Sequence, residues 1–107
     1  MKGNKWSIFR LGAAVAVFFS PFPLQAGEFT LMSYNVKNGT GMDGRRDYDR
    51  TARVIAEEKP DVVALQELDQ GTIRSSGRDT LQELAARTTL TGIYAKAIDY
   101  SGGSYGV

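Results

Sequence analysis

Two side chains in this sequence, an amide and a carboxylate, have the types and positions needed to share a hard cation. Asn35 lies near the end of a β-prone stretch, and Glu67 directly follows a second apolar stretch farther along the chain. Amide and carboxylate oxygens suit Mg²⁺, which keeps water and substrate phosphate as its other ligands. The two residues are therefore candidates for one metal site, although their spacing alone favours a turn residue and a solvated acid.

The composition restricts which metals and bases the chain can supply. The 107-residue sequence contains no histidine and no cysteine. Zinc and copper sites are built mainly from imidazole and thiolate, so neither is expected here. The chain also lacks an imidazole that could act as a general base. Any metal would be held by oxygen atoms, as Mg²⁺, Mn²⁺ and Ca²⁺ are.

The first 26 residues have the composition of a secretory signal peptide. Cationic residues precede the short apolar run Leu11–Phe19, and the segment ends on the small residue Ala26. We predict cleavage after Ala26 and a secreted or periplasmic protein; the alternative is an uncleaved membrane anchor. Residues 27–107 carry ten cationic and twelve acidic side chains, and therefore no overall basic field that would attract nucleic acid.

The hydrophobic pattern of the next segment predicts a strand, a helix and a second strand. Residues 28–36 are rich in β-formers on both faces, which predicts a strand buried largely on both sides. Asp47 is suited to cap a helix that ends before Pro60, and residues 61–66 form a short apolar strand. A right-handed crossover would make the two strands parallel. Their carboxyl ends would then bring the amide and the carboxylate to the edge where α/β sheets bind ligands.

The remaining residues predict a second helix and two further strands. Residues 68–78 are polar and predict a loop, after which Asp79 can cap a short helix. Alternation over residues 91–98 predicts a third strand, and a glycine turn at 101–104 leads into a strand that opens at Tyr105. The order of elements predicts an α/β layered architecture in one domain.

The sequences at the first two strand ends carry a family resemblance. Residues 33–36 read SYNV and residues 60–67 read PDVVALQE. Together they resemble the endonuclease/exonuclease/phosphatase superfamily of DNase I-like phosphoesterases, in which one motif ends in Asn-Val or Asn-Ile and another in Leu-Gln-Glu. The resemblance implies phosphoester hydrolysis with Mg²⁺ or Mn²⁺, with Asn35 and Glu67 as catalytic and metal-binding residues and Glu67 as the main ligand.

The same resemblance implies a larger fold than residues 27–107 can build. These residues would be the N-terminal part of a four-layered α/β sandwich, and incomplete. The family's later Asp-x-Asn and Asp-His elements are not found in this sequence. We therefore expect the chain alone to be inactive, and the full-length protein to hydrolyse a nucleic acid, a phospholipid or a small phosphoester. No stable protein partner is implied.

Two other functions remain open from the sequence. Gly39, Gly41 and Gly44 form a literal G-x-G-x-x-G between a strand and a helix, as in Rossmann dinucleotide-binding domains. Against this, the apolar stripe of the helix begins only at Tyr48, so the third glycine lies outside it. The other alternative is an exported binding module without catalytic activity.

Some charged and aromatic side chains outside the two motifs also have two interpretations. Arg45 and Arg46 are suited to reach a substrate phosphate, but neighbouring acidic residues favour a solvated surface. Tyr100 and Tyr105 flank the glycine turn and are suited to stack on a sugar or base. Packing at the rim of the core is the more common use of such tyrosines.

Overall fold

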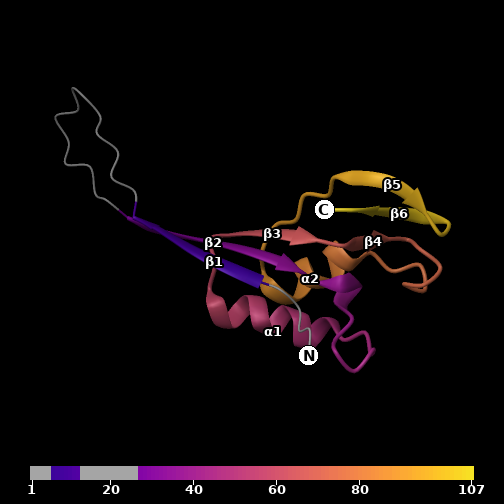
Figure 1. Cartoon of the computed structure of the whole chain (residues 1–107), viewed down its shortest axis with the longest axis horizontal. Coiled ribbons are helices and arrows are strands. Elements are labelled where there is room, and N and C mark those ends of the chain that lie inside the picture. Colours follow the sequence, from indigo (N-terminus) through magenta and orange to yellow (C-terminus); the bar gives the residue numbers. More distant parts are fainter. Residues whose placement is uncertain (1–5, 13–26) are drawn as a thin grey trace.

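The computed structural model describes residues 6–12 and 27–107. These residues form two α-helices and two three-stranded sheets (Figure 1), which confirms the expected α/β class. The first sheet has the order β1-β2-β3, with β1 at Trp6–Gly12, β2 at Glu28–Asn35 and β3 at Val62–Gln66. The second has the order β4-β6-β5, with β4 at Leu68–Gln70, β6 at Gly103–Gly106 and β5 at Lys96–Tyr100.

The predicted strand–helix–strand unit is confirmed. The helix between the strands, α1, spans Tyr48–Glu58, and the Asp47 side chain caps it by accepting a hydrogen bond from the N–H of Arg50 at 2.9 Å. Lys59 ends the helix in the left-handed conformation. β2 and β3 pair in parallel. Their carboxyl ends therefore lie side by side at one edge of the first sheet.

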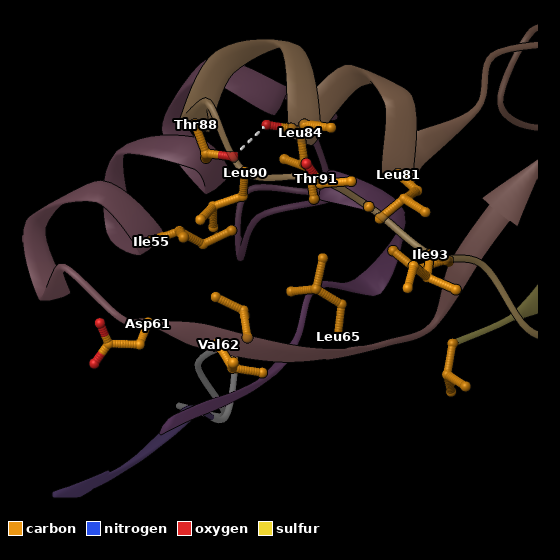
Figure 2. A pocket seen from close by; sticks show the side chains of 15 residues that line it. Ile55, Asp61, Val62, Leu65, Leu81, Leu84, Thr88, Leu90, Thr91 and Ile93 are labelled. Carbon is orange, nitrogen blue, oxygen red and sulfur yellow. Dashed lines mark hydrogen bonds between the residues drawn. The ribbon is translucent and has the colours of Figure 1, made fainter. Parts of the chain in front are cut away.

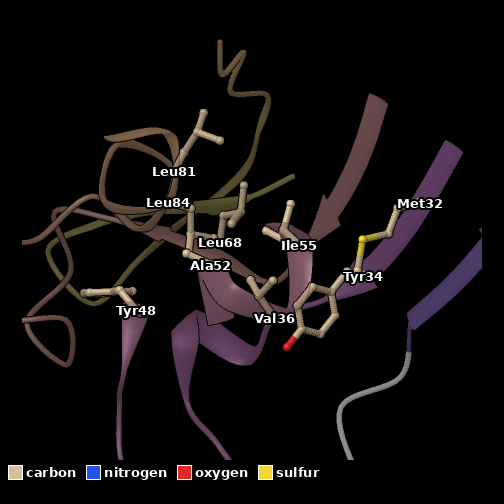
Figure 3. Packing of buried hydrophobic residues seen from close by; sticks show 9 residues of the cluster. All are labelled: Met32, Tyr34, Val36, Tyr48, Ala52, Ile55, Leu68, Leu81 and Leu84. Carbon is tan, nitrogen blue, oxygen red and sulfur yellow. The ribbon is translucent and has the colours of Figure 1, made fainter. Parts of the chain in front are cut away.

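The second predicted helix is also present and helps to build the core. This helix, α2, spans Thr80–Thr88, and the side chain of Asp79 accepts a hydrogen bond from the N–H of Gln82 at 3.1 Å. Apolar residues of α1 and α2 pack against one face of β2 (Figure 3). The buried apolar cluster consists of Met32, Tyr34, Val36, Tyr48, Ala52, Ile55, Leu68, Leu81 and Leu84.

The expectation that β2 would be buried on both faces is wrong. Met32 and Tyr34 are buried, but Leu31 and Ser33, on the opposite face, are only half-buried. Phe29 is exposed. The reason is that both helices cover the same face of the sheet (Figure 1), so the other face has no layer over it among the described residues.

The bounds of two other elements differ from the predictions. The predicted loop at 68–78 begins with the short strand β4, which pairs with β6. The strand predicted at 91–98 begins only at Lys96. Residues 91–93 instead lie against α2, where a side chain at Gly92 would come within 2.8 Å of Leu81. Pairing with β6, which alternation cannot reveal, decides where β5 begins.

Strand β1 falls within the predicted export signal. It pairs antiparallel with β2, and no strand was expected there. Residues 1–5 and 13–26 of that segment lie outside the described residues, so export and cleavage remain predictions. Neither of the helices in the described ranges is long and apolar enough to cross a membrane.

Candidate functional site

The fold brings the predicted amide and carboxylate into direct contact. Asn35 is the last residue of β2 and lies opposite Gln66, the last residue of β3. Glu67 follows at once, and the Asn35 Nδ2 group donates a hydrogen bond of 2.7 Å to Glu67 Oε1. Both side chains are half-buried. The parallel register therefore produces the juxtaposition that the sequence predicted, while the roles of the two residues remain a prediction.

A left-handed turn directly after β2 holds both members of this pair. Lys37, Asn38 and Gly39 have φ angles of 46°, 55° and 77°. The N–H of Lys37 donates to Asn35 Oδ1 at 3.1 Å, and the N–H of Asn38 donates to the backbone oxygen of Glu67 at 2.9 Å. The turn thus fixes the orientation of the amide and the position of the backbone that carries the carboxylate.

Glycine is required at one position of this turn. Gly39 has a positive φ, and a Cβ built on it would lie only 2.7 Å from the ring of Tyr48. The backbone conformation and the close approach of the ring both exclude a side chain here. Gly39 therefore lets the turn pack directly on the first residue of α1.

Glu67 itself has an unusual backbone conformation. Its φ is 61°, in the left-handed region, and it connects β3 in the first sheet to β4 in the second. For a residue with a side chain this conformation costs about 1–2 kcal/mol. Such strained residues occur often at active sites, where surrounding contacts hold them in place. Here the bond from the N–H of Asn38 supplies one such contact.

The oxygen-bearing side chains at this edge are of the kind that hard cations bind, and they would supply only part of a coordination shell. Glu67 Oε1 accepts the bond from Asn35, and Oε2 has no hydrogen-bond partner among the described residues. Within residues 6–12 and 27–107, no group of three or more potential acidic, histidine or cysteine ligands is found. A single carboxylate with nearby oxygens matches Mg²⁺, which commonly keeps several waters.

A second carboxylate, two residues after Glu67, was missed by the sequence analysis. Asp69 lies in β4 with an exposed fraction of 0% and accepts three hydrogen bonds. Arg74 donates two of them, from Nε at 2.6 Å and from Nη2 at 2.8 Å, and Thr72 Oγ1 donates the third at 2.8 Å. The local cue was an acid followed by a threonine and an arginine within one short stretch. The polar composition of residues 68–78 instead predicts a loop.

The protonation of Asp69 is set by two opposing effects. Burial by itself raises the pKa of the Asp69 carboxyl, because the charged form loses its hydration. Hydrogen bonds from Arg74 and Thr72, together with the positive charge of Arg74, outweigh burial. The pKa is therefore below its ordinary value, and Asp69 is an ion-paired structural anion at neutral pH.

The two tyrosines that flank the glycine turn pack with Arg74. The Arg74 guanidinium lies 4.6 Å from the ring centre of Tyr100 and 5.7 Å from that of Tyr105. The two rings are 6.3 Å apart and tilted. Burial, followed by the negative charge of Glu67, raises the pKa of Tyr105. Tyr105 therefore lies within electrostatic reach of the candidate site.

The glycine-rich stretch does not have the geometry of a dinucleotide loop. A bridge between Thr40 and Arg46 closes it into a hairpin-like turn before α1 begins. Any side chain at Gly41 would overlap the guanidinium group of Arg50. The loop therefore folds over an arginine, and Asp47 occupies the capping position at the start of α1.

An apolar pocket lies apart from the Asn35–Glu67 pair. It has a volume of about 180 Å³ and lies between β3 and the two helices (Figure 2). Leu65, Leu81, Leu84 and Ile93 are among its lining residues, whereas neither Asn35 nor Glu67 lines it. Its lining is mainly apolar, and its one acidic side chain, Asp61, accepts a hydrogen bond from the N–H of Thr30 at 2.7 Å, so we assign the pocket to the core.

Comparison with known proteins identifies the family. Residues 32–107 match the sequence model described as the Endonuclease/Exonuclease/phosphatase family, and the match includes both Asn35 and Glu67. No curated protein and no solved structure matches the chain. Because the matched segment covers most of the sequence and carries the strand-end pair, this chain belongs to the Endonuclease/Exonuclease/phosphatase family, a phosphoesterase-type superfamily.

Proposed function

We propose that this chain contributes to divalent-metal-dependent hydrolysis of phosphoester bonds, with Asn35 and Glu67 as catalytic residues. The observation that carries the proposal is the 2.7 Å hydrogen bond between Asn35 and Glu67 at the carboxyl edge of two parallel strands. This contact orients the carboxylate and leaves its second oxygen without a protein partner among the described residues. The family match supports the reaction class at a coarser level.

The two residues have different roles in this proposal. Glu67 holds Mg²⁺ or Mn²⁺, while Asn35 fixes the orientation of the Glu67 carboxylate through its Nδ2 group. When bound, the cation polarises a phosphoryl oxygen and stabilises charge on the leaving oxygen. The left-handed turn at Lys37–Gly39 preorganises the pair, because its N–H groups bond to Asn35 Oδ1 and to the Glu67 backbone oxygen.

Export is a separate part of the proposal. We place the protein outside the cytoplasm because residues 1–26 have the composition of a signal peptide. N-terminal sequencing of the protein recovered from the producing cells should give a first residue of Gly27. Recovery of protein that begins at Met1 would contradict export with cleavage.

Metal binding by the chain itself is the direct test of the site. Mn²⁺ titrated into isotope-labelled protein should broaden the amide resonances of residues 35–38 and 67 before all others. Glu67→Gln should weaken Mn²⁺ binding at least tenfold, about 1.4 kcal/mol, because it removes the anionic ligand. Glu57→Gln is the matched control, since Glu57 is an exposed carboxylate on α1. Equal loss in both variants, or broadening elsewhere, would reject the site.

Hydrolysis is tested on the intact enzyme that contains this sequence. Cleavage of a model phosphodiester should require Mg²⁺ or Mn²⁺ and should stop with Glu67→Ala. Full activity in excess EDTA would contradict metal dependence. Metal-dependent activity that survives Glu67→Ala would contradict the role of Glu67 and leave the reaction class in place.

A further inference from the structure

A polar groove lies on the flank of the molecule where the loop before α1 faces the turn before α2. It has a volume of about 720 Å³ and is lined by residues from 43–50 and 75–78, with Arg87 from α2. This volume lies within the range of small-molecule sites, roughly 300–1,000 Å³. Neither Asn35 nor Glu67 lines it.

The groove has an excess of positive charge. Five arginines line it against three aspartates. Two arginines are paired with aspartates, Arg50 with Asp43 at 3.1 Å and Arg87 with Asp49 at 2.6 Å. Arg45 and Arg46 form no ion pair with any carboxylate in the described part of the chain. Two arginines of the groove therefore lack an ion-pair partner, while Asp47 also lines the groove and Glu83 pairs with Arg78 and Arg87.

One of these groups is already held in place. Arg46 Nε donates to the backbone oxygen of Asn38 at 3.0 Å, and Arg46 Nη1 donates to that of Arg74 at 2.6 Å. These carbonyl groups fix the guanidinium, and its positive charge also helps to lower the pKa of the nearby Asp69 carboxyl. An anion that binds there gains a charge-assisted hydrogen bond at little cost in side-chain entropy.

The opposite side of the groove is stabilised by an aromatic ring. Arg78 and Arg87 each lie 5.8 Å from the ring centre of Tyr48, which is buried. The Tyr48 hydroxyl has no hydrogen-bond partner among the described residues. Cation–π contacts with a buried ring limit the movement of both guanidinium groups. The groove is therefore a preorganised arrangement of arginines.

We infer that this groove binds the phosphate groups of a small organic phosphate. Planar guanidinium forks match phosphate oxygens, and Arg46, which is held in place without an ion-pair partner, suits such an anion. The size of the groove and the acidic balance of residues 27–107 favour a small ligand over a nucleic acid strand. Arg46 is bonded to Asn38, whose N–H is bonded to Glu67, so the groove adjoins the candidate site.

Because the groove adjoins the candidate site, it also limits which substrates fit; this step rests on the proposed function. A phosphate in the groove cannot be the group hydrolysed beside Glu67, because Glu67 does not line the groove. The ligand then carries at least two phosphate groups, one in the groove and one at the strand-end pair.

The test is binding of pyrophosphate and inorganic phosphate to the whole chain by calorimetry, in EDTA to exclude metal-mediated binding. Arg45→Ala should weaken pyrophosphate binding about tenfold, which is one lost charge-assisted contact. Arg45→Lys should restore part of it, and Arg45→Glu should abolish it. Arg53→Ala is the matched control, because Arg53 is an exposed arginine on α1 outside the groove. Circular dichroism verifies that each variant is folded.

The other outcomes are equally decisive. Glu67→Gln should leave the affinity for inorganic phosphate unchanged, because a single phosphate occupies only the groove, so the groove is tested independently of the proposed catalytic site. Equal loss in Arg45→Ala and Arg53→Ala, or loss in Glu67→Gln alone, would overturn the assignment. A short single-stranded oligonucleotide that binds far more tightly than pyrophosphate, and loses affinity in Arg53→Ala, would show an extended nucleic acid surface and overturn the small-ligand inference.

Discussion

Glu67 and Asp69 are two carboxylates separated by one residue, and the structure uses them in opposite ways. Asp69 is fully buried and accepts three hydrogen bonds from Arg74 and Thr72, so both of its oxygens are occupied. Glu67 is half-buried, accepts one hydrogen bond from Asn35 and retains one oxygen without a protein partner among the described residues. The first arrangement stabilises the fold, and the second leaves capacity for a ligand.

The backbone conformations add to this contrast. Asp69 lies in a regular strand that pairs with β6, whereas Glu67 has a left-handed φ of 61° between two strands. An ion-paired carboxylate whose two oxygens both accept hydrogen bonds, on regular backbone, supports stability. An unsaturated carboxylate on strained backbone is more typical of a functional residue. Proximity in the sequence therefore does not imply a shared role.

The largest effect should come from Asp69→Asn. We expect a loss of about 2–3 kcal/mol in the free energy of unfolding, because Arg74 loses its charged partner and the buried amide cannot accept all three bonds. Arg74 is partly exposed, so the loss should be smaller than for a fully buried pair. Urea denaturation measures the change. Asp99→Asn, at an exposed pair with Lys96, is the control and should change stability little.

The second prediction concerns the stability of the folded chain at acid pH. The pKa of Asp69 is lower in the folded chain than its ordinary value, so the folded state binds fewer protons. The stabilisation is present above the unfolded pKa of about 3.9 and is lost as the pH falls through the folded value. Thermal melts below about pH 4 should therefore show a steep loss of stability in the native chain. A loss of equal slope in Asp69→Asn would assign the effect to other groups.

The third prediction separates strain from side-chain chemistry at Glu67. Glu67→Gly should be more stable than Glu67→Ala by about 1 kcal/mol, because only glycine adopts a φ of 61° without steric cost. Both variants should lose Mn²⁺ binding equally. Chemical denaturation gives the difference in stability. If the alanine variant were the more stable of the two, the left-handed conformation would not be a source of strain.

The smallest effect should be a change in the titration of Tyr105. Burial and, after it, the charge of Glu67 raise the pKa of Tyr105. Glu67→Gln should move this pKa part of the way back toward the ordinary value, since burial remains. Arg74→Gln should raise it further, because the positive charge of Arg74 lowers it. The carbon chemical shifts of the Tyr105 ring, followed over alkaline pH, measure the pKa of Tyr105 in both variants. An unchanged pKa in Glu67→Gln would show that the charge of Glu67 does not act on Tyr105.

The elements that follow from local sequence were predicted well. Asp47 and Asp79 were expected to cap helices, and both side chains accept the expected backbone N–H bonds. The parallel pairing of β2 and β3 followed from a strand–helix–strand order with a short connection. These features depend on side-chain chemistry and chain handedness, which a sequence expresses locally.

The features that were missed depend on contacts made when the chain folds back, and one of these contacts joins residues far apart in the chain. β4 is a strand because β6, more than thirty residues later, pairs with it (Leu68 opposite Gly106). β5 begins at Lys96 because it forms a hairpin with β6, its near neighbour in the chain, in which Lys96 lies opposite Gly106. Asp69 looks like an ordinary loop acid until Arg74 folds back on it. No local periodicity carries this information.

The sequence by itself determined which oxygen-bearing residues stand at the ends of two strands and which family motifs surround them. It also determined the absence of histidine and cysteine, which restricts a metal to oxygen ligands. Only the tertiary structure decided that Asn35 bonds to Glu67, that Asp69 is saturated by Arg74, and that unpaired arginines line a groove beside Asn38. The physical reason is that composition fixes which ligands are available, whereas the way the chain folds back on itself decides which oxygens gain a protein partner. It does so over 32 residues for Asn35 and Glu67 and over five for Asp69 and Arg74.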